Sequence, residues 1–197
     1  MNDWLYSETV KEHFVNPKNV LLEDEALWQC DGRGIVGNIK CGDQMLVLIR
    51  VKNDIIDDVR WKTYGCASAI ASTSILSEAI KGMAITEAYK LRPEDIVAKL
   101  GGLPANKIHC SVLGDKALRA AIDDYMEKNG RESLHGQEQT TLICTCLNVT
   151  DKDLEEAYKN GDRTWDDLQA RTKIGTGCGK CKEAAMAKMH EFEHLYG

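Results

Sequence analysis

Apolar and polar residues alternate over much of the first third of the chain. Residues 45–51 place Met, Val, Ile and Val at every second position, and a period of two is that of a strand with two distinct faces. Asn53 and Asp54 form a turn signal, after which residues 59–64 alternate again. Together with a shorter run at 35–40, this pattern predicts a three-stranded antiparallel sheet.

Segments with a helical pattern precede and follow the predicted strands along the chain. An amphipathic segment precedes it at 4–14 and stops at Asn16 and Pro17, because proline cannot donate a helical hydrogen bond. Four further segments, each ended by a glycine or a proline break, are expected to be helices over 67–81, 86–91, 93–100 and 115–128. The order of elements predicts an α+β fold in which helices pack on the sheet.

A polar stretch at 127–141, with two glycines and hardly an apolar side chain, has the composition of a linker. The expected parts are a first domain, a linker and a second domain, over 1–130, 131–141 and 142–197. The second domain has an almost entirely helical pattern, with helices expected at 151–159, after Thr164 and at 181–195. It contains few apolar residues, so we expect a small all-α domain that a bound cofactor stabilises.

Charge and hydropathy exclude several classes of protein. The chain has 197 residues and a net charge of −6, with −3 on residues 1–130 and −3 on 131–197. Neither part has a basic patch, which disfavours nucleic acids and anionic membranes as partners. No apolar run is long enough to span a membrane, and the charged residues within the first fifteen positions argue against a secretory signal. We therefore expect a cytoplasmic protein that does not bind membranes.

The unusual feature of the composition is its eight cysteines. Disulfide frameworks belong mainly to short secreted chains without a large core, so metal or redox chemistry is the better interpretation here. Four cysteines form a C-x-C motif and, 31 residues later, a C-x-x-C motif: Cys144, Cys146, Cys178 and Cys181. The other four are scattered: Cys30, Cys41, Cys66 and Cys110.

The clustered set can form a site of four thiolates. In an extended segment Cys144 and Cys146 would point to the same side, and Cys178 and Cys181 would share one face at a helix N-terminus. The glycines around Cys178 would let backbone N–H groups approach a bound anionic centre. Spacing alone leaves a structural zinc and a 2Fe–2S cluster equally open. A thioredoxin-type redox pair is disfavoured, because no βαβ pattern surrounds it and two cysteines would have no role.

A resemblance decides between zinc and a cluster. The C-x-C and C-x-x-C motifs, with the sequence Gly-Thr-Gly-Cys-Gly-Lys-Cys-Lys at 175–182, resemble the 2Fe–2S domain of bacterioferritin-associated ferredoxins over residues 142–197. The resemblance implies a small helical module with a permanent, redox-active 2Fe–2S cluster on Cys144, Cys146, Cys178 and Cys181.

The scattered set offers a second site. Cys66 follows a glycine at a predicted helix N-terminus, where the pKa of a thiol is lowered, and Asp43 and His109 each lie within two residues of another cysteine. These contexts favour a shared site of Cys41, Cys66 and Cys110. Three thiolates leave one position open, which Asp43 or His109 could fill. A carboxylate is a harder ligand than iron–sulfur clusters prefer, so Asp43 would favour a cluster that leaves.

Four segments of the first domain resemble the IscU/NifU iron–sulfur scaffold family. They are Lys-Glu-His-Phe-Val-Asn-Pro-Lys-Asn-Val at 11–20, Val-Gly-Asn-Ile-Lys-Cys-Gly-Asp at 36–43, Thr-Tyr-Gly-Cys-Ala-Ser-Ala-Ile-Ala-Ser-Thr-Ser at 63–74 and Leu-Pro-Ala-Asn-Lys-Ile-His-Cys-Ser at 103–111. The resemblance spans residues 4 to about 130. It implies an IscU-like fold and an assembly site at Cys41, Asp43, Cys66, His109 and Cys110.

A scaffold domain followed by a bound 2Fe–2S domain is the NifU arrangement, which the whole sequence resembles. That arrangement implies a scaffold and not an enzyme. A cysteine desulfurase of the NifS or IscS type would deliver sulfur, and a transient 2Fe–2S or 4Fe–4S cluster would form and pass to apo-proteins or carrier proteins. The same site could hold iron or zinc, and a homodimer is expected.

The sequence also departs from the family pattern. A third domain with its own C-x-x-C, usual in NifU proteins, is not found in this sequence, and the chaperone-recognition motif reads Leu-Pro-Ala-Asn-Lys at 103–107, which puts a DnaK-type partner in doubt. Cys30 matches no family cysteine and is expected to be a spare thiol. Two rival functions stay open: a 2Fe–2S electron carrier whose first domain binds structural zinc and docks partners, and a thiol oxidoreductase using Cys178 and Cys181.

Overall fold

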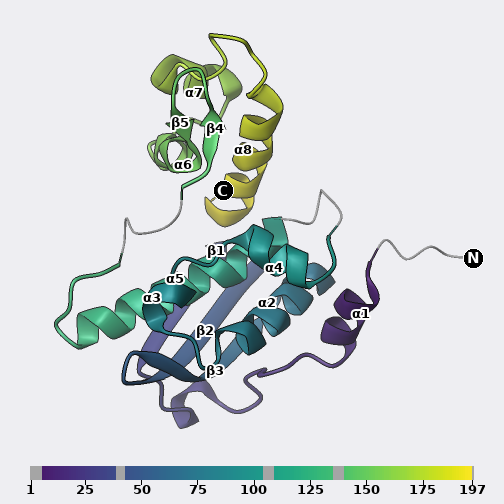
Figure 1. The fold of residues 1–197 in the computed structure, drawn as a ribbon, viewed down its shortest axis with the longest axis vertical. Coiled ribbons are helices and arrows are strands. Elements are labelled where there is room, and N and C mark those ends of the chain that lie inside the picture. The colour runs from purple at the N-terminus through teal and green to yellow at the C-terminus, as the bar shows by residue number, and fades with distance from the viewer. Residues whose placement is uncertain (1–5, 39–42, 104–108, 135–139, 197) are drawn as a thin grey trace, which may run out of the picture. The chain divides into compact units, whose positions relative to one another are not determined.

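The computed structural model describes residues 6–38, 43–103, 109–134 and 140–196. The chain divides into two compact units, residues 1–138 and 139–197 (Figure 1). The first unit contains a three-stranded antiparallel sheet with helices packed on it, and the second is mainly helical. The α+β fold class predicted from the sequence is confirmed.

The sheet of the first unit is a meander in the order β1-β2-β3, formed by β1 (Gly32–Asn38), β2 (Asp43–Lys52) and β3 (Ile55–Thr63). Asn53 and Asp54 join β2 to β3 with φ angles of 53° and 60°. Two consecutive residues with positive φ make the tight turn that fits the right-handed twist of a hairpin. The turn signal in the sequence therefore marks a real two-residue hairpin.

The helices of the first unit lie before and after the sheet. They are α1 (Glu8–Val15), α2 (Ala67–Ile80), α3 (Ile85–Ala88), α4 (Pro93–Lys99) and α5 (His109–Lys128), with a short 3-10 turn, η1 (Glu25–Leu27), before β1. The long helices α2 and α5 cover one face of the sheet (Figure 1). On the opposite face, Leu46 and Leu48 pack against Leu21 and Trp28. The sheet is therefore buried on both sides near its centre.

Helix α5 rests on β1 at two glycines. A Cβ atom placed at Gly34 would collide with the carbonyl oxygen of Ala117 and lie 2.5 Å from the amide nitrogen of Ala121, and one placed at Gly32 would collide with the carbonyl oxygen of Ala121. Helix backbone and strand backbone are thus in direct contact, which only glycine permits. This contact fixes the position of α5 along β1.

Helix α5 and strands β1 and β3 begin earlier than the sequence predicts, and β3 starts at Ile55 and not at 59. Helix α5 starts at His109 and not at 115, and β1 starts at Gly32 and not at 35. Both extensions contain glycines that lower the local helix or strand propensity. Gly114 in α5 is accommodated because it lies against α2, where an added Cβ would be 2.9 Å from Oγ1 of Thr73. Tertiary packing outweighs propensity at both positions.

The second unit consists of β4 (Leu142–Cys144), β5 (Val149–Thr150), α6 (Asp151–Lys159), α7 (Trp165–Thr172) and α8 (Lys182–Tyr196). Its core joins the three helices, and the rings of Tyr158 and Phe192 lie 5.7 Å apart between α6 and α8. The sequence predicts an extended segment at Cys144 and Cys146, which is a strand only as far as Cys144. Its pairing with β5 was not predicted, because strands of three and two residues are too short to show a period. No described helix has the length and apolarity needed to cross a membrane.

The α5–β1 contact predicts the effect of a single methyl group. Gly34→Ala should lower the free energy of unfolding by at least about 3 kcal/mol, because the obstructing atoms are backbone and cannot turn away. The measurement is urea unfolding followed by circular dichroism. Gly82→Ala is the control: its φ is +81°, and no described atom lies within 4 Å of the added Cβ, so only a backbone cost of about 1 kcal/mol is expected. Equal losses in the two variants would contradict the packing argument.

Candidate metal centres

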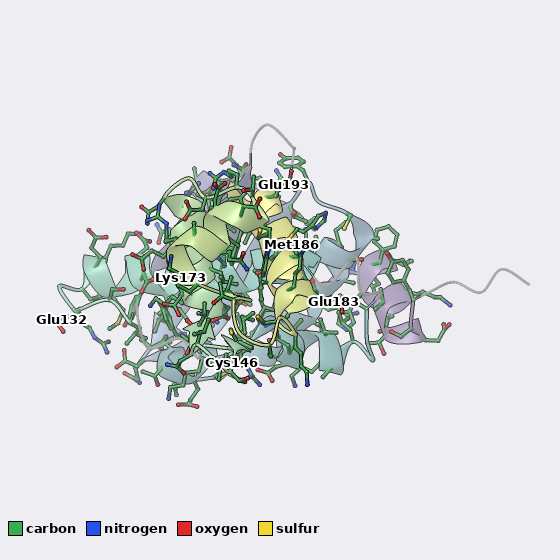
Figure 2. The ribbon with its side chains drawn as sticks, turned by 90° about the horizontal axis from the view of Figure 1, so that it is seen from above. Glu132, Cys146, Lys173, Glu183, Met186 and Glu193 are labelled. Atoms are coloured by element: carbon green, nitrogen blue, oxygen red, sulfur yellow. The ribbon has the colours of Figure 1, made fainter. Side chains whose placement is uncertain are left out.

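The four cysteines of the second unit form two pairs. The thiol of Cys146 lies 3.4 Å from the sulfur of Cys178, and Cys144 and Cys181 are linked through their titration, since the thiol of Cys181 lowers the pKa of Cys144. Each pair takes one cysteine from the C-x-C motif and one from the C-x-x-C motif. Figure 2 labels Cys146, which lies against the loop that precedes α8.

The pairs differ from the local geometry that the motifs predict. Strand β4 ends at Cys144, so Cys146 lies in a turn and not on the same side of an extended segment. Cys178 and Cys181 lie in the loop before α8 and not on one helix face. As a result Cys144 and Cys181 are buried, at 3% and 7% exposure, while Cys146 and Cys178 are exposed. The expectation that the two thiols of each motif share one side is wrong, because Cys146, Cys178 and Cys181 lie in turns and not on a strand or a helix.

Backbone N–H groups surround the sulfurs. Burial raises the pKa of Cys144, but hydrogen bonds from the N–H of Leu147, the thiol of Cys181 and the N–H of Gly175 outweigh it, and the net shift is downward. The pKa of Cys178 is lowered by the N–H of Lys180 first and by Cys146 second. A lower pKa means more thiolate at neutral pH, which is the form that binds metals.

The remaining member of the buried pair shifts the other way. Burial, followed by the neighbouring Cys144, raises the pKa of Cys181, although the N–H of Gly175 opposes the shift. Cys181 is thus the thiol and Cys144 the thiolate of this pair, and metal binding, which needs both as thiolates, would release the proton of Cys181.

The donor set fits a centre of two iron ions. Two thiolates bound to one tetrahedral ion at about 2.3 Å lie about 3.8 Å apart, close to the 3.4 Å between Cys146 and Cys178. A 2Fe–2S cluster takes four thiolates, two at each iron, and the second unit has four cysteines that could supply them.

Four of the five predicted residues of the first unit, those that the structure describes, lie at one end of the sheet. Asp43 begins β2, Cys66 caps the N-terminus of α2 after β3 has ended at Thr63, and His109 and Cys110 begin α5. The register brings the two strand ends together, because Met45 pairs with Thr63.

Contacts with the sheet bring the two helix ends to the same place. Thr73 of α2 lies 3.6 Å from the sulfur of Met45, and Gly34 in β1 contacts Ala117 of α5. Each helix therefore starts near the end of the sheet at which β2 begins.

Only one of these five residues has a described side chain. Cys66 is exposed, with φ −72° and ψ 171° at the cap. Cys41 lies outside the described residues, as do the side chains of Asp43, His109 and Cys110. The ligand set of the first unit stays a prediction, with four of its five backbone positions placed at one end of the sheet.

Side chains of α7 contact the loop that carries Cys178 and Cys181. Sequence reasoning noted the glycines of the loop but missed Trp165 and Gln169, whose side chains contact Gly175. Their spacing of four residues on a helix was the available signal. Cys30 packs beside the Leu21–Trp28 cluster, and burial raises the pKa of its thiol. A spare thiol with a packing role fits this environment.

Residues 5–132 match the family described as the NifU-like N terminal domain, which is well over half of the chain. The chain belongs to the NifU family. Residues 142–191 match a second description, the BFD-like [2Fe-2S] binding domain. The resemblance to this family inferred from the sequence is confirmed for both units.

Relatives of the NifU family match one or both units. The protein named nitrogen fixation protein NifU from Azotobacter chroococcum is 39% identical over 91% of this chain and 57% of its own length, and that from Nostoc is 40% identical over 90% and 61%. The iron-sulfur cluster assembly scaffold protein IscU of Aquifex aeolicus is 51% identical over 64% of this chain and 79% of its own. The chain thus spans about three fifths of the NifU proteins that it matches.

A solved structure, a NifU-like N-terminal protein from Brucella abortus, superposes with a TM-score of 0.48 at 16% identity, covering 63% of this chain and 96% of that one.

The crossed pairs of this NifU-family chain predict which disulfides form when the metal-free protein is oxidised. Mild oxidation should join Cys146 to Cys178 first, because their sulfurs are already 3.4 Å apart and exposed. Peptide mapping by mass spectrometry measures the linkage. A Cys178–Cys181 disulfide as the first product would contradict the crossed arrangement and favour a thioredoxin-type pair.

Proposed function

We propose that this chain is a scaffold on which iron–sulfur clusters are assembled, and that its second unit holds a resident 2Fe–2S cluster. The observation that supports this most strongly is the combination of two family matches in one chain, a NifU-like unit and a BFD-like [2Fe-2S] unit. Relatives that match across both units are named NifU, and relatives that match the first unit alone are named cluster assembly scaffolds.

The cluster under construction is the substrate of the first unit. Cys66 is exposed at a helix N-terminus, where the partial positive charge favours a thiolate. A cysteine desulfurase of the NifS or IscS type supplies persulfide sulfur, iron joins it, and Cys41, Cys66 and Cys110 hold the product. The chain holds the reactants and is not itself an enzyme.

The composition of the first site suits release of the product. Three thiolates leave one corner to Asp43 or His109, and a carboxylate is a hard ligand for iron in a cluster. A ligand of this kind at the fourth position exchanges more readily than a fourth thiolate would. The assembled 2Fe–2S or 4Fe–4S cluster is therefore transferred to apo-proteins or carrier proteins, in the cytoplasm, where thiols stay reduced.

The second unit serves a different purpose. Four thiolates, two of them buried, would hold a cluster permanently. When bound, that cluster supplies single electrons. Assembly consumes electrons, since each persulfide sulfur takes two to become sulfide and the joining of two 2Fe–2S units into a 4Fe–4S cluster takes two more. A homodimer that places two first units together would allow such joining.

Reconstitution tests the two centres separately. As purified, the wild type should show a stable 2Fe–2S absorbance. Desulfurase, cysteine and iron without oxygen should add a second, labile cluster of about two iron and two sulfide per chain. Cys66→Ala should lose only the labile cluster, because its ligand is in the first unit, and Cys144→Ala only the stable one. Iron, acid-labile sulfide and visible circular dichroism measure both.

Cys30→Ala is the matched control for reconstitution, because Cys30 is a thiol of the first unit outside both proposed ligand sets. It should keep both clusters. If reconstitution adds no labile iron and sulfide to the wild type, the scaffold proposal is wrong and an electron carrier with zinc in its first unit is favoured. If the purified protein is colourless and holds zinc in its second unit, the resident cluster is wrong.

The carboxylate at position 43 has an expected effect on release. Asp43→Ala should retain the labile cluster longer and slow its transfer to an apo-ferredoxin severalfold, because a hard ligand is removed from the exchanging corner. Transfer is followed by the circular dichroism of the acceptor. Faster transfer from the variant would show that Asp43 holds the cluster and does not help it leave.

A further inference from the structure

Strand β3 leaves the sheet just before a proposed ligand of the first unit. Its ladder with β2 ends at Thr63, and three residues later Cys66 caps the N-terminus of α2. The first amide beyond the ladder, that of Tyr64, still reaches the carbonyl oxygen of Gln44, at 3.4 Å. The next amide belongs to Gly65, which is half-buried, so it needs an acceptor that the ladder no longer provides.

The side chain of Thr63 supplies this acceptor and makes a second hydrogen bond at the same time. Its Oγ1 accepts from the N–H of Gly65 at 3.0 Å and donates to the carbonyl oxygen of Gln44 at 2.8 Å. A hydroxyl group has one proton and two lone pairs, so both bonds form together. Thr63 lies opposite Met45, whose sulfur is 3.6 Å from Thr73 of α2, on the face of the sheet that α2 covers. The hydroxyl therefore bridges β2 and the turn that leads into α2.

The two residues that share this hydroxyl stand next to two of the proposed ligands. Gln44 follows Asp43, the first residue of β2, and Gly65 precedes Cys66, the cap of α2. A hydrogen bond to each neighbour restricts the backbone that carries the ligand. Because both bonds meet at one oxygen atom, Thr63 restricts the separation of the backbone at Asp43 from the backbone at Cys66.

We propose that Thr63 is a positioning residue of the first unit, which holds Asp43 and Cys66 at a fixed separation so that both can bind the cluster under construction. The inference rests on the assembly site proposed above and adds a residue that lies outside its ligand set. Groups that orient the ligands of a metal centre by hydrogen bonds change its affinity by about 10- to 100-fold, although they do not touch the metal.

A purely local role for Thr63 makes a different prediction. Threonine accepts from the N–H two residues ahead in many turns, and this bond stabilises the turn alone. In that case, loss of the hydroxyl would loosen the Gly65 amide and leave the cluster unaffected. If Thr63 joins the two ligand positions, the same loss would loosen the amide and also shorten the lifetime of the labile cluster.

Valine and serine variants separate the hydroxyl from the shape of the side chain. Thr63→Val keeps the branched shape and the strand propensity but removes both hydrogen bonds, whereas Thr63→Ser keeps the hydroxyl. The full chain is reconstituted with desulfurase, cysteine and iron without oxygen, and circular dichroism checks that each variant is folded. Thr63→Val should lose its labile cluster to a chelator about tenfold faster than the wild type, and Thr63→Ser should lose it at close to the wild-type rate.

Thr86→Val is the matched control for the loss of a threonine hydroxyl. Thr86 is exposed on α3, which follows the bridge between Ala84 and Ile55 at the opposite end of β3 from Thr63. This variant should keep the labile cluster as long as the wild type does.

Hydrogen exchange of the Gly65 amide tests the contact without a cluster. In the metal-free protein, exchange should be about tenfold faster in Thr63→Val than in the wild type and Thr63→Ser. Equal exchange rates in all three proteins overturn the contact. Faster exchange with an unchanged cluster lifetime overturns the positioning role and leaves a local turn. A wild type that forms no labile cluster overturns the scaffold proposal and this inference with it, whereas a wild type that forms one which Thr63→Val keeps equally long overturns only the positioning role.

Discussion

The first unit depends on the direct contact between the backbone of α5 and strand β1. Gly34 and Gly32 leave no side chain between them, so the helix lies as close to the sheet as its backbone allows. Because α2 packs beside α5 through Gly114, the positions of both helices along the sheet are fixed by contacts that cannot slide. The residues that begin α5 and cap α2 are therefore held at the end of the sheet where β2 begins, without any ligand to gather them.

The cysteines of the second unit are held in place by a different kind of contact. Its strands are too short and its helices too few to hold four cysteines on rigid elements, and all four lie at the end of β4, in a turn or in a loop. The loop that carries Cys178 and Cys181 is held against α7, where the side chains of Trp165 and Gln169 lie beside Gly175 and Gln169 donates to the carbonyl oxygen of Ile174. A site of this kind depends on its ligand for part of its stability, as the small apolar content of the unit suggests. The proposed scaffold site of the first unit can form before iron and sulfur bind, whereas the proposed resident site of the second unit can form around its cluster.

Much of this organisation could be predicted from the sequence, and the failures have physical causes. The hairpin at Asn53 and Asp54 was predicted because positive φ has a strong residue preference. The early starts of α5 and β1 were missed because Gly34 and Gly114 lower local propensity while they permit the packing that stabilises these elements. The crossed pairing of Cys144 with Cys181 was missed because spacing reports only neighbours along the chain. The contact between Trp165 and Gly175 was missed because it depends on the turn that ends α7 and places Gly175 against the ring.

Under the proposal of a resident cluster, the unequal burial of the two sulfur pairs would separate two demands on the centre. Electron transfer requires a short path, which the exposed pair of Cys146 and Cys178 would offer to a partner. A defined potential requires little water around the cluster, and the buried pair of Cys144 and Cys181 would exclude it. With all four sulfurs exposed, water would dominate the potential and the cluster would be lost readily. With all four buried, exchange with partners would be slow. Each motif contributes one cysteine to the buried pair and one to the exposed pair, so neither motif alone could form either pair. The 31 residues between the motifs therefore have to fold before all four cysteines come together.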